Sequence, residues 1–143
     1  MQALPAELAH LSLQPHPEGG FYRETYRSNH LTVIDYLLLS GGFSGWHKVD
    51  GCDEVWNHHR GGRMALHLLS PDGVYRVVEL GKIQFSEVVP AGWWQAAEAL
   101  DSKWTLVGCT VGPPFDFSAF TMADDALFER FPQHARLRRL IRR

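Results

Sequence analysis

Glycine and proline are spaced so closely along this sequence that few long helices fit between them. Thirteen glycines and eight prolines separate apolar, aromatic and β-branched runs that are too short for ordinary helices. Such runs, at intervals of about ten residues and with no helical pattern between them, favour an all-β sandwich or closed barrel. The strands that we predict cover residues 21–26, 32–39, 45–49, 54–58, 64–69, 74–80, 85–89, 93–97 and 104–111.

Local signals place one turn and the helices. The run Pro71-Asp72-Gly73 predicts a hairpin turn, because proline presets φ and glycine tolerates a positive φ. Helices are expected only at the ends of the chain. A short one begins near Pro5, and a second begins at about residue 124 and is broken at Pro132.

Composition and charge exclude several classes of protein. The length of 143 residues fits one domain, and 45% hydrophobic against 21% charged residues is typical of a chain that folds. Five of the fourteen basic residues lie in the last eight positions, so the first 135 residues carry nine basic and sixteen acidic side chains, a charge of −7. We interpret the basic tail as the solvated face of a terminal helix and expect no nucleic-acid partner.

The sequence also has no membrane or export signal of the usual kinds. No apolar stretch approaches the roughly 20 residues of a membrane span, and the first residues lack a signal-peptide pattern. Cys52 and Cys109 are too few for a disulfide scaffold and belong to no C-x-x-C pair. We therefore expect a cytoplasmic protein with reduced cysteines and no membrane partner.

Two segments combine polar side chains with turn residues at unusual spacings. They read Gly41-x5-His47-x-Val49-x4-Glu54-x6-Gly61 and Pro90-x-Gly92-x-x-Gln95. In the first, an imidazole and a carboxylate flank a turn and are able to converge across a hairpin. In the second, Gln95 follows a turn at the start of a strand.

These segments resemble the two motifs of the cupin superfamily, G-x5-H-x-H-x(3,4)-E-x6-G and P-x-G-x-x-H. The sequence has Val49 and Gln95 where the motifs have their second and third histidines, both metal ligands. A more specific resemblance is to the small bacterial and fungal cupins of domain-of-unknown-function family 985, the cupin-5 type. It covers nearly the whole chain, and the matching segments are residues 15–28, 46–47, 53–56, 68–73, 89–96 and 107–111.

The resemblance implies one cupin domain over residues 1–143. Its fold would be a double-stranded β-helix, or jelly-roll barrel, with a core at about residues 19–112 and a helical tail at about 123–143. It also implies a homodimer and a fold like that of the sugar-nucleotide epimerase branch of the superfamily. The short loop 28–31 and the run 57–59 depart from the family pattern and would alter the mouth of the pocket.

The alternation of strand side chains predicts which residues line a cavity in such a barrel. The predicted lining residues are His47, Glu54, Trp56, His58, Trp93 and Gln95. In this hypothesis His47 abstracts a proton, Glu54 orients and charge-stabilises His47, and Gln95 binds a substrate oxygen. Tryptophans near both motifs suggest an aromatic wall, with core packing as the alternative. These are Trp46, Trp56, Trp93 and Trp94. Since Trp93 and Trp94 face opposite ways in a strand, only Trp93 is expected in the cavity.

The N-terminal segment adds two further candidate ligand-binding residues. Arg23 could clamp an anionic group of the ligand, or form a structural ion pair with Glu18 or Glu24. Tyr22 or Tyr26 is a candidate general acid by analogy with the epimerase branch.

A metal site is the less favoured interpretation. His47, Glu54 and Gln95, with His58 nearby, would be the ligands of a divalent ion, but an amide is a poor substitute for imidazole. We therefore favour a cavity without a cofactor. Three functions stay open: a metal-independent isomerase or epimerase of a small polar metabolite or sugar derivative, a non-catalytic small-molecule binding module, and a metal-dependent cupin enzyme.

Overall fold

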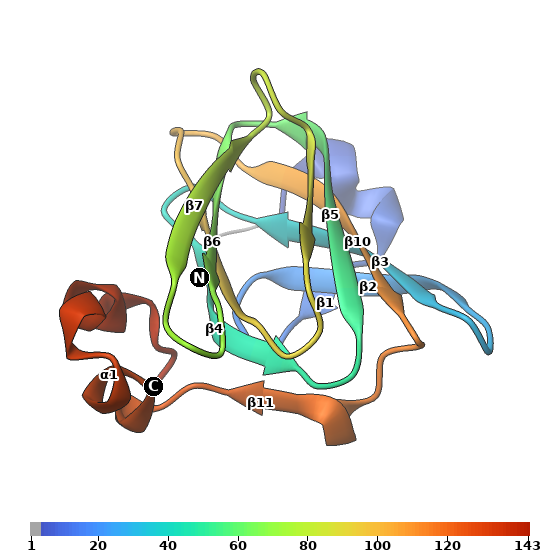
Figure 1. Ribbon diagram of the computed structural model, residues 1–143. Helices are drawn as coiled ribbons and strands as arrows, with labels where there is room; N and C mark the ends of the chain where they lie inside the picture. The colour runs from blue at the N-terminus through green and yellow to red at the C-terminus, as the bar shows by residue number, and fades with distance from the viewer. Residues whose placement is uncertain (1–3) are drawn as a thin grey trace.

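The computed structural model describes residues 4–143 and consists of two antiparallel sheets that face each other (Figure 1). The first sheet has the order β1-β2-β3-β10-β5-β8, and the second has the order β11-β4-β9-β6-β7. Strands of the first sheet are β1 (Gln14–Pro15), β2 (Phe21–Arg27), β3 (Thr32–Leu38), β5 (Asp53–Gly61), β8 (Ser86–Val89) and β10 (Thr105–Gly112). Those of the second are β4 (Phe43–Val49), β6 (Met64–Leu69), β7 (Tyr75–Leu80), β9 (Trp94–Ala99) and β11 (Phe120–Met122).

All nine predicted strands are confirmed, with ends that match or differ by up to three residues. The predicted hairpin turn is also present: the N–H of Ser70 donates to Val74, and Gly73 has a φ of 91°. The sequence did not predict β1 or β11, because strands of two and three residues are too short to show alternation. They form by pairing with β2 and β4.

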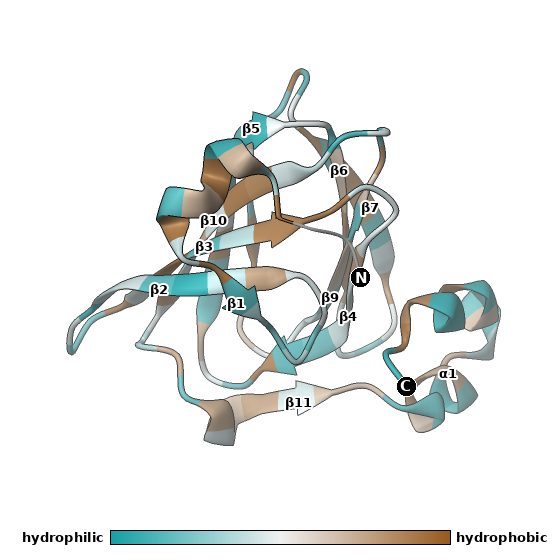
Figure 2. Ribbon diagram, turned by 180° about the vertical axis from the view of Figure 1, so that it is seen from behind, coloured by the Kyte–Doolittle hydropathy of each residue, from teal (hydrophilic) through white to brown (hydrophobic). Residues whose placement is uncertain are grey.

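Most of the core lies between the two sheets. Strand β10 pairs with both β3 and β5 at the centre of the first sheet, and it is largely apolar (Figure 2). Side chains from both sheets meet there, and the largest are Tyr36, Trp56, Met64, Leu66, Leu68, Leu80 and Val107. This packing fills the middle of the barrel, so a cavity is confined to an end.

The outer face of the second sheet is covered by the C-terminal tail. The tail contains α1 (Asp125–Arg130), which the side chain of Asp124 caps, and the 3-10 segment η3 (Pro132–Leu140). Its apolar side chains pack on Trp46 and Leu69, and the indole Nε1 of Trp46 donates to the carbonyl of Leu137 at 2.9 Å. The other 3-10 segments are η1 (Ala6–Leu11) and η2 (Phe117–Ala119).

The basic residues of the tail lie on the surface and are partly paired with acidic groups of the barrel and of the tail itself. Arg139 binds Glu98 through two hydrogen bonds of 2.6 and 2.9 Å, and Arg143 binds Asp125. In the part of the chain that the structure describes, no helix has the length and apolar character needed to cross a membrane.

Candidate functional site

A cavity of about 540 Å³ lies at one end of the barrel. It is bounded by β2, β3, β4, β5 and β10, by the loop before β2, and by the chain that follows β10. Figure 1 shows that chain running across the end of the barrel to β11, which pairs with β4. The polar and aromatic side chains that line it include His16, Glu18, Tyr22, Glu24, Arg27, Thr32, His47, Glu54, Phe115, Asp116, Phe117 and Phe120.

His47 is an almost fully enclosed polar side chain of the cavity wall, with 2% of its surface exposed. It lies on β4 between β9 and β11, opposite Gln95 and Met122. Its Nδ1 lies 2.7 Å from the carbonyl oxygen of Gly45, and its Nε2 lies 2.7 Å from Oε2 of Glu18. A carbonyl oxygen only accepts, so Nδ1 carries a proton, and an ionised Glu18 requires a second proton on Nε2.

The electrostatics of this pair favour an imidazolium opposite a carboxylate. Burial disfavours the charged form of His47, but the charge and hydrogen bond of Glu18 outweigh it and raise the pKa of His47 to about 9. Burial also opposes ionisation of Glu18, but His47 outweighs it and lowers the pKa of that carboxyl group. At neutral pH, therefore, both nitrogens of His47 carry protons.

Gly45 connects the two members of this ion pair. Its N–H donates to the carbonyl of Glu18 at 2.7 Å, and its own carbonyl accepts from Nδ1 of His47. The side chain of Arg142 fills the space beside it, because a Cβ on Gly45 would lie 2.3 Å from Cγ of Arg142. The end of the tail thus packs directly behind the Glu18–His47 pair.

Glu54 forms a second acidic group in the wall. It lies on β5, is 7% exposed, and its Oε1 accepts a 3.0 Å hydrogen bond from Nε2 of Gln95. Gln95 is held in turn by Nε1 of Trp56, which donates to its Oε1 at 2.7 Å. Burial, together with the charge of Glu18, outweighs the influence of His47 and Gln95 and raises the pKa of Glu54 to about 7.

Aromatic side chains close the cavity on the side of β11. Phe115, Phe117 and Phe120 contact one another edge to face, with ring centres 4.8 to 5.9 Å apart. The ring of Phe120 lies 5.3 Å from that of His47, and Phe117 is half exposed. Phenylalanines, rather than the predicted tryptophans, therefore form the aromatic surface of the cavity.

His16 contributes a neutral imidazole. Its Nδ1 accepts a 3.1 Å hydrogen bond from the backbone N–H of Glu18, which places the ring proton on Nε2. Burial lowers the pKa of His16, Glu18 opposes this, and His47 reinforces it. At neutral pH His16 is therefore an uncharged donor at the cavity wall.

Three of the residues predicted from the sequence line the cavity, namely His47, Glu54 and Tyr22. The expectation that Glu54 orients His47 was wrong, because Glu18 occupies that place. Among the described residues, Glu54 has no basic partner within 4.0 Å. Gln95 and Trp56 lie behind Glu54 and do not line the cavity, so the prediction that they face a ligand was also wrong.

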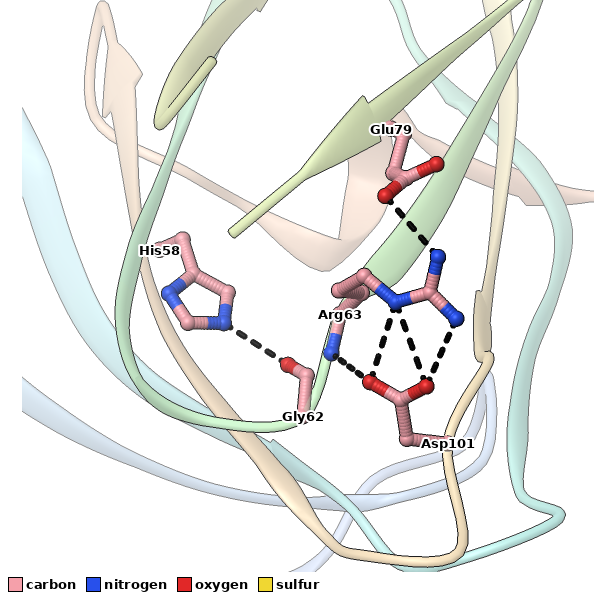
Figure 3. Close-up of polar contacts among 5 residues, drawn as sticks. All are labelled: His58, Gly62, Arg63, Glu79 and Asp101. Atoms are coloured by element: carbon pink, nitrogen blue, oxygen red, sulfur yellow. Dashed lines mark hydrogen bonds and ion pairs between the residues drawn. The ribbon is translucent and has the colours of Figure 1, made fainter. Parts of the chain in front are cut away.

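His58 and Trp93 lie elsewhere, contrary to the prediction. His58 donates from Nε2 to the carbonyl of Gly62 at 2.7 Å, beside the Arg63–Asp101 ion pair outside the cavity (Figure 3). Although it shares the inward face of β5 with Glu54, it is four residues further along the strand. Trp93 packs against the core between the sheets.

The alternation of strand side chains turns Arg23 and the outer tryptophans away from the cavity. Tyr22 and Glu24 face the cavity, so Arg23 faces away, and its nearest polar contact is the carbonyl of Leu11 at 3.5 Å. Neither proposed ion pair of Arg23 forms, since Glu18 binds His47 and Glu24 binds Arg27. Trp46 and Trp94 likewise lie on the outer face, under the tail.

The residues at the motif positions do not fit a metal ion. Val49 offers no ligand atom, both nitrogens of His47 are engaged, and both ends of the Gln95 amide are hydrogen-bonded. Within residues 4–143, no three His, Cys, Asp or Glu side chains are grouped as metal ligands. The missing histidines are therefore replaced by an apolar side chain, Val49, and by an amide, Gln95, that is engaged by Trp56 and Glu54.

Two facing antiparallel sheets with a cavity at one end define a cupin. More specifically, the chain belongs to the family described as Cupin superfamily (DUF985), whose model matches residues 7–123. Glu18 and His16 lie in segment 15–28, which the sequence resemblance already covered. From the sequence alone, Glu18 was considered only as a structural partner of Arg23.

Solved structures support the same assignment. A protein of Shewanella oneidensis is 30% identical and has a TM-score of 0.90, over 100% of this chain and 99% of that one. A hypothetical protein from Leishmania major is 29% identical, with a TM-score of 0.86 over 96% of this chain and 98% of that one. The capsular polysaccharide assembling protein CapF of Staphylococcus aureus shares only the fold, at 13% identity and a TM-score of 0.66 over 76% of this chain and 33% of that one. Among curated proteins, none matches the sequence significantly.

Proposed function

We propose that this protein binds a small polar carbonyl compound in the cavity and isomerises it by acid/base chemistry. The observation that carries the proposal is the placement of a buried, unpaired carboxyl group, Glu54, in the same cavity wall as a protonated imidazole, His47. A volume of about 540 Å³ lies within the roughly 300–1,000 Å³ typical of small-molecule sites.

The two groups have different roles in this proposal. With a pKa of about 7, the carboxyl group of Glu54 is able both to accept and to release a proton at neutral pH. As the carboxylate it takes a proton from the carbon next to the substrate carbonyl, and it becomes the carboxylic acid. The electron pair of the broken C–H bond forms a C=C bond and the carbonyl π pair moves onto its oxygen, which gives an enediolate. Glu54 then returns the proton to the former carbonyl carbon, while the hydroxyl proton of the neighbouring carbon passes to the enediolate oxygen, so that the C=O bond forms again one carbon along.

His47 stabilises the charge that develops during this step. Both ring nitrogens of His47 are engaged by Gly45 and Glu18, so the imidazolium forms no ion pair with the ligand. Its positive charge acts through space and favours the negative enediolate oxygen over the neutral carbonyl. We therefore assign proton transfer to Glu54 and electrostatic stabilisation to His47, the reverse of the roles expected from the sequence. Glu18 holds the imidazole in its charged form and in a fixed orientation.

Solvent deuterium exchange tests the proposal without knowledge of the natural substrate. The protein is incubated in D₂O with a panel of unphosphorylated aldoses and ketoses, and proton NMR follows loss of the signal from the carbon next to the carbonyl. We expect exchange with the wild-type protein, and none with Glu54→Gln. An exposed control, Arg23→Gln, should exchange like the wild type because Arg23 lies outside the cavity.

The same experiment separates an enzyme from a binding module. Ligand binding that persists in both wild type and Glu54→Gln, with no exchange in either, would identify a non-catalytic binding protein. Exchange that survives in Glu54→Gln would overturn the role given to this carboxyl group.

A further inference from the structure

The positive charges of the cavity wall are all matched by carboxylates of the wall itself. His47 binds Glu18 at 2.7 Å, and Arg27 binds both carboxylate oxygens of Glu24, at 2.7 and 3.2 Å. Arg27 also donates to the carbonyl of Phe115 at 2.9 Å. In the described part of the chain, no lining cation is therefore free to receive an anionic group of a ligand.

The remaining charged groups of the wall are acidic. Glu54 has a single amide donor, Gln95, and Asp116 is held by the backbone N–H of Ser118 at 2.8 Å. Four carboxyl groups thus line the cavity, against the two cations His47 and Arg27. A carboxylate or phosphate entering this space would lose its hydration and meet like charge.

Uncharged polar groups complete the wall. The Nε2–H of His16 is a donor, and the hydroxyls of Thr32 and Tyr22 donate or accept. The phenylalanine wall offers an apolar surface beside His16, and it suits the C–H face of a ring or chain. A hydroxylated, uncharged molecule matches both kinds of surface.

We infer that the ligand of this cavity is an uncharged hydroxycarbonyl compound and that the cavity rejects carboxylated and phosphorylated analogues of it. This inference rests on the function proposed above. A cationic ligand is disfavoured by the same function, because an ammonium group beside Glu54 would hold the carboxylate ionised and prevent its return of a proton. The selectivity against anions arises because His47 is paired with Glu18 and Arg27 is paired with Glu24.

The inference is tested with probes of similar size that differ in charge. Binding of D-glucuronamide and of D-glucuronate to the whole protein is measured by calorimetry and thermal shift at pH 8. We expect the amide to bind at least about tenfold more tightly than the carboxylate. Glu24→Gln removes the partner of Arg27, which is on the exposed rim, and should reduce this preference by improving glucuronate binding. Arg23→Gln, outside the cavity, should leave the preference unchanged.

Each other outcome overturns the inference. Equal or tighter binding of glucuronate would contradict the exclusion of anions, and tighter binding of D-glucosamine than of glucuronamide would identify a cation site instead. Failure of all three probes to bind would also contradict it. Since binding is the readout, charge selectivity without deuterium exchange would refute only the proposed reaction, whereas exchange without charge selectivity would refute only this inference.

Discussion

The Nε2 atom of His47 lies 2.7 Å from Oε2 of Glu18, and this buried contact joins the two sheets of the barrel. Glu18 comes from the loop between β1 and β2 of the first sheet, and His47 comes from β4 of the second. Both side chains are at most 6% exposed, so water screens their attraction little. The pair is therefore both a structural link and the source of the positive charge in the cavity.

Glu18→Gln should destabilise the protein by about 3 to 5 kcal/mol at pH 7, because removal of one partner leaves the other buried charge uncompensated. Urea unfolding measures the change. Glu24→Gln breaks the exposed pair with Arg27, and it should cost no more than about 1 kcal/mol. A loss below about 1 kcal/mol for Glu18→Gln would show that the buried pair contributes no more than a surface pair.

Glu54→Gln should change how stability depends on pH. The folded protein raises the pKa of Glu54 from 4.5 to about 7, so the folded state binds this proton more tightly than the unfolded chain does. The resulting stabilisation is complete below pH 4.5 and is lost as pH rises to about 7. It amounts to about 3 kcal/mol. As pH rises from 4.5 to 7, the unfolding free energy should therefore fall less steeply for Glu54→Gln than for the wild type. Parallel curves of unfolding free energy against pH would contradict the raised pKa of Glu54.

Much of the fold followed from local sequence patterns. The nine strands from β2 to β10 show short apolar runs between turn residues, and these runs determine the barrel. His47 and Glu54 were recognised because their motif spacing places each on an inward position of its strand. Tyr22 was named with Tyr26 by analogy with the epimerase branch.

The rest of the site depends on contacts between distant segments. Glu18 and His47 are 29 positions apart in the sequence and meet only because the loop before β2 reaches the second sheet. The wall of Phe115, Phe117 and Phe120 forms because β11 returns to pair with β4. Neither relation has a periodic signal in the sequence.

Gly45→Ala should destabilise the protein by about 1 to 3 kcal/mol, because the new methyl group would lie 2.3 Å from Cγ of Arg142. The double variant Gly45→Ala, Arg142→Ala removes this overlap. It should be more stable than the sum of the two single changes predicts, by a coupling energy of about 0.5 to 3 kcal/mol. Strict additivity in thermal or urea unfolding would contradict the packing of Arg142 behind the ion pair.

Trp46→Phe should loosen the C-terminal tail. The substitution removes the Nε1 donor and leaves the buried carbonyl of Leu137 without that partner, at a cost of about 1 to 3 kcal/mol. Trypsin should then cleave the tail faster at its arginines. Trp94→Phe is a matched control in the same apolar cluster, because its indole makes no hydrogen bond within the described chain. Equal cleavage rates for the two variants would contradict the role of the Trp46 hydrogen bond.

The protonation of His47 is the most direct test of this account, and NMR of protein with ¹⁵N-labelled histidine measures it. At pH 7 both ring nitrogens of His47 should show the chemical shifts of an imidazolium, and they should titrate with a pKa of about 9. In Glu18→Gln the same resonances should titrate at lower pH, since the charge of Glu18 is the main influence that raises this pKa. A neutral His47 at pH 7 in the wild-type protein would contradict the assignment of His47 as the stabilising cation and with it the proposed mechanism.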